Sequence, residues 1–379
     1  MISHIVYVLG WMIIFLSNLV VPRIFTDIKI LPTLFPRDSI EDISHSLCTK
    51  EFQARRSSYY WVCNSLKVYC PVQWEYGRLN LQYTVVSKRK IKKLIDAGVV
   101  QNWDDPRLFT LSALRRRGIP PEAINLFCAR VGVTMAQVML EPSMLDSVCR
   151  EVLNKTCQRA MCVVDPIKVN ITNFKDLKSS VNTKISVKNH PDDESMGEHQ
   201  ISLSDTVFIE NSDFTKTTSD KGYKRMTSTQ PVALKYAGLV LKYQNSVSEK
   251  EVNVTAEVLS TSNKPKGFIH WVDANNSLPI RIKSYSQLFK SANPEAVPGG
   301  FVKDINQNSL DIIETAVMDK YFGDLVRKNL LLTRESEYSP VEFLRAQFER
   351  TGYFCLDRMD SKIEKMPVFN KTIGLKDSR

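Results

Sequence analysis

The pattern of apolar and polar residues changes once along this chain. Between residues 85 and 153 apolar residues recur three or four positions apart, which predicts a helical region. From about residue 157, short runs rich in β-branched and aromatic residues alternate with turn sequences, as is typical of antiparallel β-barrels. These runs cover residues 163–173, 206–210, 232–243, 251–259, 267–272 and 280–289.

Three helices are predicted in the first region. Ser87 can cap the first, which Gly98 ends. Pro121 suits the first turn of the second, and the third follows Pro142, with Ser143 as its candidate cap. The residues expected to face inward are Ile91, Leu94 and Ile95, then Ile124, Phe127, Cys128 and Val131, and finally Leu145, Val148, Cys149 and Val152.

The helix after Ser87 begins with a charge pattern that is unfavourable for an isolated helix. Lys88, Arg89, Lys90 and Lys92 lie at an end that already carries positive partial charge. A phosphate held there by backbone N–H groups and a lysine would remove the conflict. A solvated basic helix start is the alternative, and charge alone leaves both interpretations open.

Composition indicates a folded protein with a basic surface. A chain of 379 residues can hold two or three domains, and 43% hydrophobic with 24% charged residues is typical of globular proteins. The net charge of +10 suits a polyanionic partner such as nucleic acid. A merely basic cytosolic protein would have the same net charge.

The cysteines indicate neither a metal site nor disulfides. No C-x-x-C occurs among the eight cysteines, and the five histidines do not pair with them at zinc-finger spacing. Reduced and mostly buried thiols in a cytoplasmic protein are therefore expected. We predict no metal ligands.

The segment Val85–Arg89 (VVSKR) resembles the lysine-bearing signature loop of class I aminoacyl-tRNA synthetases. Longer blocks resemble glutaminyl-tRNA synthetase, in colinear order over about residues 38–379. Eukaryotic-type glutamyl-tRNA synthetase shares the loop and the WDDPR block but fits the other blocks less well. The blocks are residues 76–81 (YGRLNL), 98–107 (GVVQNWDDPR), 113–133 (ALRRRGIPPEAINLFCARVGV), 347–357 (QFERTGYFCLD) and 369–377 (FNKTIGLKD).

The resemblance implies an α+β multidomain fold. Residues 38–84 correspond to the C-terminal remnant of a class I Rossmann catalytic domain, and residues 85–156 to the signature loop and helical domain. Residues 157–379 correspond to an anticodon-binding region of two antiparallel β-barrels. The distal barrel is expected at about residues 214–293 and the proximal barrel in the rest of that region. Residues 323–345 are longer than the usual linker of the family, and no structure is predicted for them.

Residues 1–37 look unrelated to the family's first Rossmann half, which is expected at this place. Within them residues 5–21 form an apolar run that is short beside the about 20 residues of a membrane span. The run also lacks the basic flank and cleavage site of a signal peptide. An altered or mispredicted start is favoured, and a membrane anchor through residues 5–21 stays open as the alternative.

By resemblance, ATP and glutamine would bind around the signature loop. Lys88 and Ser87 would be the catalytic residues, with Lys88 neutralising phosphate charge in the transition state. Magnesium would accompany ATP. The matching ATP-site positions are Thr49, Arg78, Leu79, Val86, Ser87 and Lys88, and Gln73 matches a residue of the glutamine pocket. Ordinary packing or capping is the alternative for Thr49, Leu79 and Val86.

The tRNA contacts implied by the resemblance lie further along the chain. Thr134 and Gln137 belong to a segment that touches tRNA in the family. Lys235 replaces the family's usual arginine, which keeps the charge but loses the planar fork of the guanidinium. The positions that match anticodon recognition are Arg159, Arg225, Lys235 and Gln347.

One motif of the family is absent from this sequence. None of His4, His45, His190, His199 and His270 forms the H-x-G-H phosphate motif. The expected function is glutamine–tRNA ligase acting on tRNA(Gln), in a truncated and catalytically impaired form that could belong to a multi-synthetase complex. The alternatives are a non-catalytic tRNA-binding module and a glutamyl-tRNA synthetase relative.

Overall fold

The structure is a computed structural model that describes all residues except 1–37, 137, 221, 335–342, 362–365 and 377–379. The chain divides into two compact units, one of residues 1–80 and 131–140 and the other of residues 81–130 and 141–379. The apolar run at residues 5–21 lies outside the described residues. Within the described residues, no helix combines the length and the apolar character needed to cross a bilayer.

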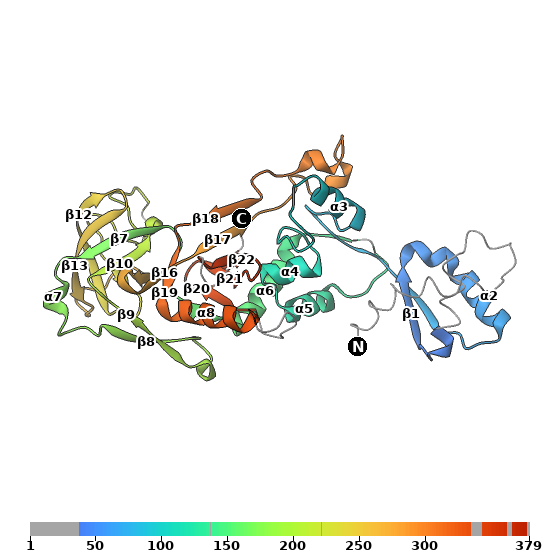
Figure 1. Cartoon of the computed structure of the whole chain (residues 1–379), viewed down its shortest axis with the longest axis horizontal. Coiled ribbons are helices and arrows are strands. Elements are labelled where there is room, and N and C mark those ends of the chain that lie inside the picture. The colour runs from blue at the N-terminus through green and yellow to red at the C-terminus, as the bar shows by residue number, and fades with distance from the viewer. Residues whose placement is uncertain (1–37, 137, 221, 335–342, 362–365, 377–379) are drawn as a thin grey trace. The chain divides into compact units, whose positions relative to one another are not determined.

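The first unit contains a parallel strand pair joined by a helical crossover (Figure 1). Strand β1 (His45–Thr49) pairs with β2 (Val72–Tyr76) in parallel, and η3 (Lys50–Arg55) and α2 (Arg56–Leu66) connect them. Leu47 is 59% exposed and Trp74 is 47% exposed. Parallel strands are usually covered on both faces, so this pair is poorly protected from solvent.

A second short sheet of this unit joins distant parts of the sequence. Strand β3 (Leu79–Leu81) pairs with β4 (Val138–Leu140), and the Gly77 N–H donates to the carbonyl oxygen of Thr134 at 2.7 Å. A Cβ atom at Gly77 would lie 2.2 Å from the Ala136 oxygen. Only glycine therefore allows the two backbones this approach.

The helices predicted after residue 85 are present in the structure. They are α3 (Lys88–Asp96), α5 (Pro121–Val131) and α6 (Pro142–Thr156), and a further helix that was not predicted, α4 (Leu111–Arg117), lies between α3 and α5. Ile91 and Leu94 are buried as predicted, and so are Leu145, Val148 and Cys149. Two capping details differ. Ser87 occupies the N-cap position of α3 without a side-chain hydrogen bond, and the N-cap of α6 is Glu141 rather than Ser143, because Pro142 already takes the first helical position.

The prediction for Cys128 is wrong, since its side chain is exposed. Only Ala123 and Phe127 of α5 are buried, so the apolar stripe of this helix is narrower than its sequence suggests. Five of the eight cysteines are buried and all eight are free thiols, as expected.

The largest sheet in the described residues after 157 is a curved seven-stranded sheet (Figure 1). Its strand order is β14-β11-β12-β13-β7-β10-β15. The edge strands β14 and β15 are separated in sequence by His270 alone, so the sheet must curl back on itself into a nearly closed barrel. The strands are β7 (Pro166–Ile171), β10 (Thr206–Glu210), β11 (Val232–Leu234), β12 (Leu239–Ser248), β13 (Glu251–Val258), β14 (Phe268–Ile269) and β15 (Trp271–Asp273).

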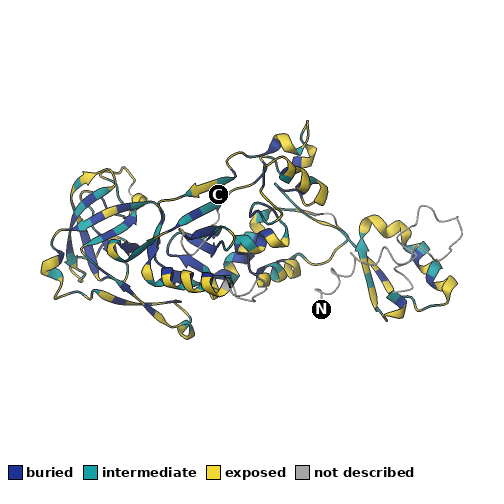
Figure 2. Ribbon diagram, in the orientation of Figure 1, coloured by how far each residue is buried: buried dark blue, intermediate teal, exposed yellow. Residues whose placement is uncertain are grey.

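A six-stranded sheet in the order β18-β17-β22-β21-β20-β5 forms a second core around Phe348, Phe354 and Phe369. Figure 2 shows the buried residues gathered inside both sheets. The strands are β5 (Gln158–Ala160), β17 (Arg281–Tyr285), β18 (Leu310–Ile313), β20 (Arg345–Phe348), β21 (Gly352–Leu356) and β22 (Val368–Gly374). Smaller elements are β6 (Cys162–Val163), β16 (Ser277–Pro279) and β19 (Val317–Asp319) in one sheet, the hairpin of β8 (Lys184–Lys188) and β9 (Glu198–Ser202), and α7 (Phe174–Leu177).

The sheets are mixed, whereas the sequence predicted antiparallel ones. Within the described strands, each of the two large sheets has two parallel pairings. In every case the paired strands are distant in sequence, so long connections bring them together. The predicted combination of helices and strands is confirmed, whereas the prediction that all strands of these sheets pair antiparallel is wrong.

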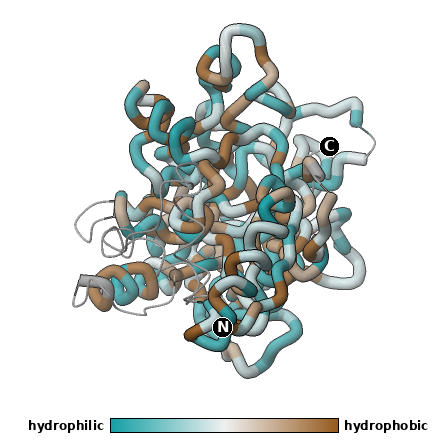
Figure 3. Tube along the Cα trace, turned by 90° about the vertical axis from the view of Figure 1, so that its right-hand side faces the viewer, coloured by the Kyte–Doolittle hydropathy of each residue, from teal (hydrophilic) through white to brown (hydrophobic). Residues whose placement is uncertain are grey.

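Residues for which no structure was predicted form much of a helix, α8 (Lys320–Arg334). Phe322, Val326 and Leu330 recur every four residues and are buried against the six-stranded sheet. Figure 3 shows hydrophobic and hydrophilic residues interleaved along the helical traces, as expected of elements with one buried face. Asp319 precedes the helix, and its Oδ1 accepts from the Phe322 N–H at 2.9 Å. Burial raises the pKa of Asp319 to about 6.

Candidate functional site

The start of α3 keeps the uncompensated charge that its sequence predicts. The side chains of Val86, Ser87 and Lys88 are all exposed. Lys90 forms an ion pair with Glu295, whereas neither Lys88 nor Arg89 has an ion-pair partner among the described residues. Two free cations therefore remain at the positive end of a helix, and an anion bound there would relieve their repulsion.

The other predicted ATP-site residues, and the predicted glutamine-site residue, belong to the first unit. Thr49 ends β1, and Arg78 follows the end of β2 by two residues, so both lie at the carboxyl ends of the parallel pair. Arg78 Nε is 3.0 Å from Glu51 Oε1. Gln73 is buried on β2, where its amide donates to Cys48 Sγ at 3.1 Å, and Leu79 is exposed. Ligands of open parallel sheets bind at the carboxyl ends of the strands.

Of the two predicted tRNA-contacting residues in this unit, Thr134 is exposed. Its hydroxyl oxygen accepts from the Ala136 N–H at 3.3 Å. Gln137 lies outside the described residues. The neighbouring Val133 and Met139 are also exposed, so the described part of this segment presents its side chains to solvent.

Two of the predicted anticodon residues meet in the six-stranded sheet. Arg159 on β5 is directly opposite Gln347 on β20, and its Nη1 donates to Gln347 Oε1. Arg159 Nη2 also donates to Asn154 Oδ1 at 3.0 Å. Both side chains are largely buried, at 7% and 9% exposure of the whole residues. The bond uses the acceptor of Gln347 and leaves its two N–H donors available.

A third predicted residue, Lys235, lies against the same strand end. Its Nζ is 2.8 Å from Glu349 Oε2, and the Tyr236 hydroxyl donates to Glu349 Oε1 at 3.0 Å. Burial opposes the charge on Lys235, but the hydrogen bond to Glu349 outweighs it and raises the pKa of the lysine. Lys235 therefore stays charged, and its side chain is 31% exposed.

Arg225 shares a buried carboxylate with Arg350. Asp213 is fully buried, and its Oδ1 accepts from Arg225 Nε at 2.7 Å and from Arg350 Nη2 at 2.8 Å. Arg350 Nη1 donates to Asp213 Oδ2 at 2.6 Å and lies 3.3 Å from His270 Nδ1. Burial opposes the charge on Arg350, and the bonds to Asp213 raise its pKa. The arrangement places this arginine where the seven-stranded sheet closes.

The segment Gln347–Arg350 links all of these groups. Gln347 holds Arg159, Glu349 holds Lys235, and Arg350 shares Asp213 with Arg225. Arg350 has a positive φ of 64°, in the turn between β20 and β21. Four consecutive residues thus collect the three basic side chains that the sequence predicted separately.

Asp213, Glu349 and Arg350 were not predicted from the sequence. Glu349 and Arg350 lie within the QFER block, so their place in that block was the available signal. The sequence held no signal that marks Asp213 as functional, because an aspartate between a strand and a turn is a common surface residue. No group of side chains that could hold a metal ion occurs in the described part of the chain.

Three family models match the chain in succession. The model of tRNA synthetases class I (E and Q), catalytic domain, matches residues 14–155, and two models of the anti-codon binding domain of the same synthetases match residues 157–261 and 268–330. The first match begins within the segment 1–37, ahead of residue 38 where the resemblance was placed.

Named relatives agree with these matches. Glutamine–tRNA ligase of Bos taurus is 51% identical over 348 residues, and that of Mus musculus is 52% identical over 348 residues, each match covering 90% of this chain and 42% of the relative. Glutamine–tRNA ligase of Buchnera aphidicola is 38% identical over 353 residues and 59% of it is covered. The chain thus spans less than half the length of the animal relatives. These matches show that the chain belongs to the class I (E and Q) tRNA synthetases and corresponds to the C-terminal portion of a glutaminyl-tRNA synthetase.

Proposed function

We propose that this protein takes part in the ATP-dependent ligation of glutamine to tRNA(Gln), and that its β-sheets read the anticodon. The observation that carries the proposal is the Gln347–Arg350 segment, which gathers Arg159, Lys235 and Arg225. The relatives are named glutamine–tRNA ligases, so a glutamyl-tRNA synthetase relative is not favoured. The curled seven-stranded sheet and the six-stranded sheet would serve as the distal and proximal barrels.

The geometry suits recognition of unpaired bases. Single-stranded RNA is read by side chains that hydrogen-bond the edges of splayed bases. Arg225 and Lys235 are partly exposed, yet Asp213 and Glu349 hold them in place. Such preorganised donors lose little conformational entropy when a base binds. Lys235 offers a point charge rather than a planar fork, so its contact would discriminate less sharply than that of an arginine.

The start of α3 suits the phosphates of ATP. Lys88 and Arg89 supply positive charge beside the free N–H groups of the helix end, and Lys88 would neutralise the phosphate that glutamine attacks. Magnesium would accompany the phosphates of ATP. By resemblance to the family, Thr49, Arg78 and Leu79 of the first unit would contact ATP, and Gln73 of that unit would contact glutamine.

A binding experiment tests the anticodon proposal. The full chain should bind a tRNA transcript with a glutamine anticodon more tightly than the same transcript with a changed anticodon. Arg225→Ala should reduce that preference, with a loss on the cognate transcript of about 1–3 kcal/mol. Lys242→Ala is the matched control, because Lys242 is similarly exposed and pairs with Glu257. Equal losses on both transcripts would show that Arg225 touches phosphates only.

The second candidate function is a non-catalytic tRNA-binding module. The names of the relatives do not favour it, although no H-x-G-H motif occurs in these 379 residues. Glutamine-dependent exchange of labelled pyrophosphate into ATP separates the two, since removing even one preorganised donor costs about 10²–10³ in rate. We expect little exchange from this polypeptide alone, and full exchange would rule out the non-catalytic function. The eight free thiols suit the cytoplasmic localisation that we propose.

A further inference from the structure

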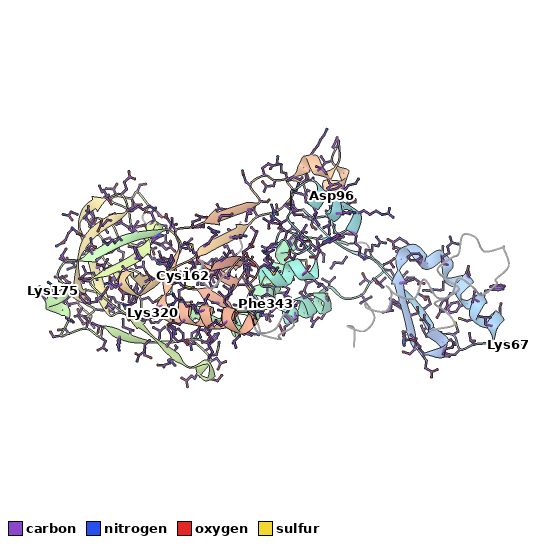
Figure 4. All side chains as sticks on the ribbon, viewed as in Figure 1. Lys67, Asp96, Cys162, Lys175, Lys320 and Phe343 are labelled. Atoms are coloured by element: carbon purple, nitrogen blue, oxygen red, sulfur yellow. The ribbon has the colours of Figure 1, made fainter. Side chains whose placement is uncertain are left out.

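A cavity of about 230 Å³ lies in the second unit, where β9, β15, β19 and the start of α8 meet. It is larger than a single water molecule needs and smaller than the about 300–1,000 Å³ of pockets that hold drug-sized molecules. Figure 4 labels Lys320, which belongs to the wall formed by α8. None of the residues proposed above to contact ATP, glutamine or the anticodon lines this cavity, so a ligand bound here would be separate from all three.

A buried carboxylate in the cavity has one oxygen without a hydrogen-bond partner. Asp319 lines the cavity and is 5% exposed. Its Oδ1 accepts from the Phe322 N–H, whereas its Oδ2 has no partner among the described residues. Burial raises the pKa of Asp319 to about 6 although backbone N–H groups act against it, so the carboxyl group is charged at neutral pH. A buried charged oxygen without a donor is costly, and a donor bound in the cavity would remove that cost.

The other charged groups of the lining leave the interior of the cavity negative. Asp273 is also buried, and its oxygens accept from a hydroxyl group and from two amide N–H groups, all of them neutral donors. Asp324 lies 3.6 Å from Arg327 and so has its own cation. Two buried carboxylates, Asp273 and Asp319, therefore face the exposed Lys320 and the about half positive charge at the start of α8.

Aromatic side chains also line the cavity, and other contacts fix their orientation. Trp271 is buried, and its Nε1 donates to the Lys235 carbonyl oxygen at 2.9 Å. Tyr321 stacks on His199, with the ring centres 4.5 Å apart and the planes at 9°. The face of an aromatic ring attracts cations, and its apolar surface accepts a short carbon chain. Such rings beside a carboxylate suit an organic cation better than a hydrated inorganic ion.

We infer that this cavity binds a small alkylammonium compound whose –NH₃⁺ group donates to Asp319 Oδ2. The ammonium group would supply both the donor and the positive charge that this carboxylate lacks, and the carbon chain would lie against Trp271 and Tyr321. A water molecule could donate to the same oxygen but would leave its charge uncompensated. The inference goes beyond the proposed ligation of glutamine to tRNA and does not depend on it.

Fluorine NMR of the full chain labelled with fluorotryptophan tests the inference. The chain has 5 tryptophans, of which Trp271 lines the cavity, and the signal missing from Trp271→Phe identifies its resonance. n-Butylammonium chloride, added in place of sodium chloride at constant ionic strength, should shift this resonance and leave the others unchanged. We expect a Kd on the order of 1 mM, because so small a ligand can gain only limited binding free energy.

Two variants with the same change of charge separate the cavity from the rest of the surface. Asp319→Asn should raise the Kd for n-butylammonium by about tenfold or more, because it removes the charge that the ammonium group meets. Its side-chain oxygen can still accept from the Phe322 N–H, so the start of α8 should be retained. Asp165→Asn is the control, because Asp165 pairs with Lys250 at the surface and does not line the cavity, and its Kd should equal that of wild type.

Neutral and fully methylated ligands test the chemistry without any variant, so they remain informative if a substitution disturbs folding. n-Butanol has the same carbon chain without the charge, and tetramethylammonium has the charge without an N–H donor. Both should shift the Trp271 resonance less than n-butylammonium does. The inference is overturned if this resonance does not respond to n-butylammonium, if n-butanol shifts it equally, or if magnesium chloride abolishes the response and so assigns the cavity to a metal ion. An Asp319→Asn protein with the Kd of wild type would overturn it as well.

Discussion

Replacing Asp213 by asparagine should destabilise the seven-stranded sheet and release Arg225. Asp213 is fully buried, and its two oxygens accept three hydrogen bonds from Arg225 and Arg350 at 2.6 to 2.8 Å. An asparagine has nearly the same shape but no charge, and its amide group would face donors of Arg350. The variant would therefore leave two guanidinium groups without their anion.

The size of the effect follows from burial. Removing one partner of a buried ion pair costs about 3–5 kcal/mol. The side chains of Arg225 and Arg350 are 42% and 27% exposed, so water recovers part of the loss. We therefore expect the lower end, about 3 kcal/mol, which corresponds to roughly a 150-fold change in the local unfolding equilibrium.

Native-state hydrogen exchange measures this change locally. It suits the protein because a chain with more than one compact unit need not unfold in a single transition. Amides of β10 and β15 should lose roughly 150-fold in protection, and discrimination between anticodons should weaken in the same variant. Asp165→Asn is the control, because its pair with Lys250 is half exposed and contributes under about 1 kcal/mol. If the amides of β10 and β15 are as well protected from exchange in Asp213→Asn as in Asp165→Asn, the reasoning is refuted.

Three further predictions concern the protonation of Asp319, the ion pair of Lys235 and the solvent exposure of the β1–β2 pair. The folded-state pKa of Asp319 is about 6, above the ordinary 3.8, so this residue should favour folding at low pH and lose that contribution as pH rises from about 4 to 6. At pH 7 the Asp319→Asn variant should therefore have a higher melting temperature than wild type, and its free energy of unfolding should be larger by up to about 3 kcal/mol. This gain should vanish near pH 4, and a gain that does not depend on pH would contradict the prediction. Lys235→Ala leaves the Glu349 carboxylate without its cation and should weaken binding of cognate tRNA, whereas Lys235→Arg should retain or improve that binding. Titration of each variant with cognate tRNA measures this, and equal affinities of the two variants would argue against a base contact by residue 235. Amides of β1 and β2 should exchange faster than those of β7 and β10, because Leu47 and Trp74 leave the parallel pair open to solvent; equal protection would contradict this.

The elements with a strong period were predictable from the sequence. A regular apolar stripe on a helix is removed from water only when that face packs against the core. The predicted stripes are therefore buried, at Ile91 and Leu94 on α3 and at Leu145, Val148 and Cys149 on α6. Helix α8 was missed although Phe322, Val326 and Leu330 carry the same signal. Cys128 was placed inward because the sequence cannot say how wide a stripe the neighbouring elements cover.

The resemblance to glutaminyl-tRNA synthetase located Arg159, Arg225, Lys235 and Gln347 one by one, but no local pattern states which side chains hold them. Their partners Asp213, Glu349 and Arg350 are brought to them by strand pairing across long sequence separations. The parallel pairings of the mixed sheets escape sequence analysis for the same reason, since alternation shows which face of a strand is buried and says nothing about its neighbour.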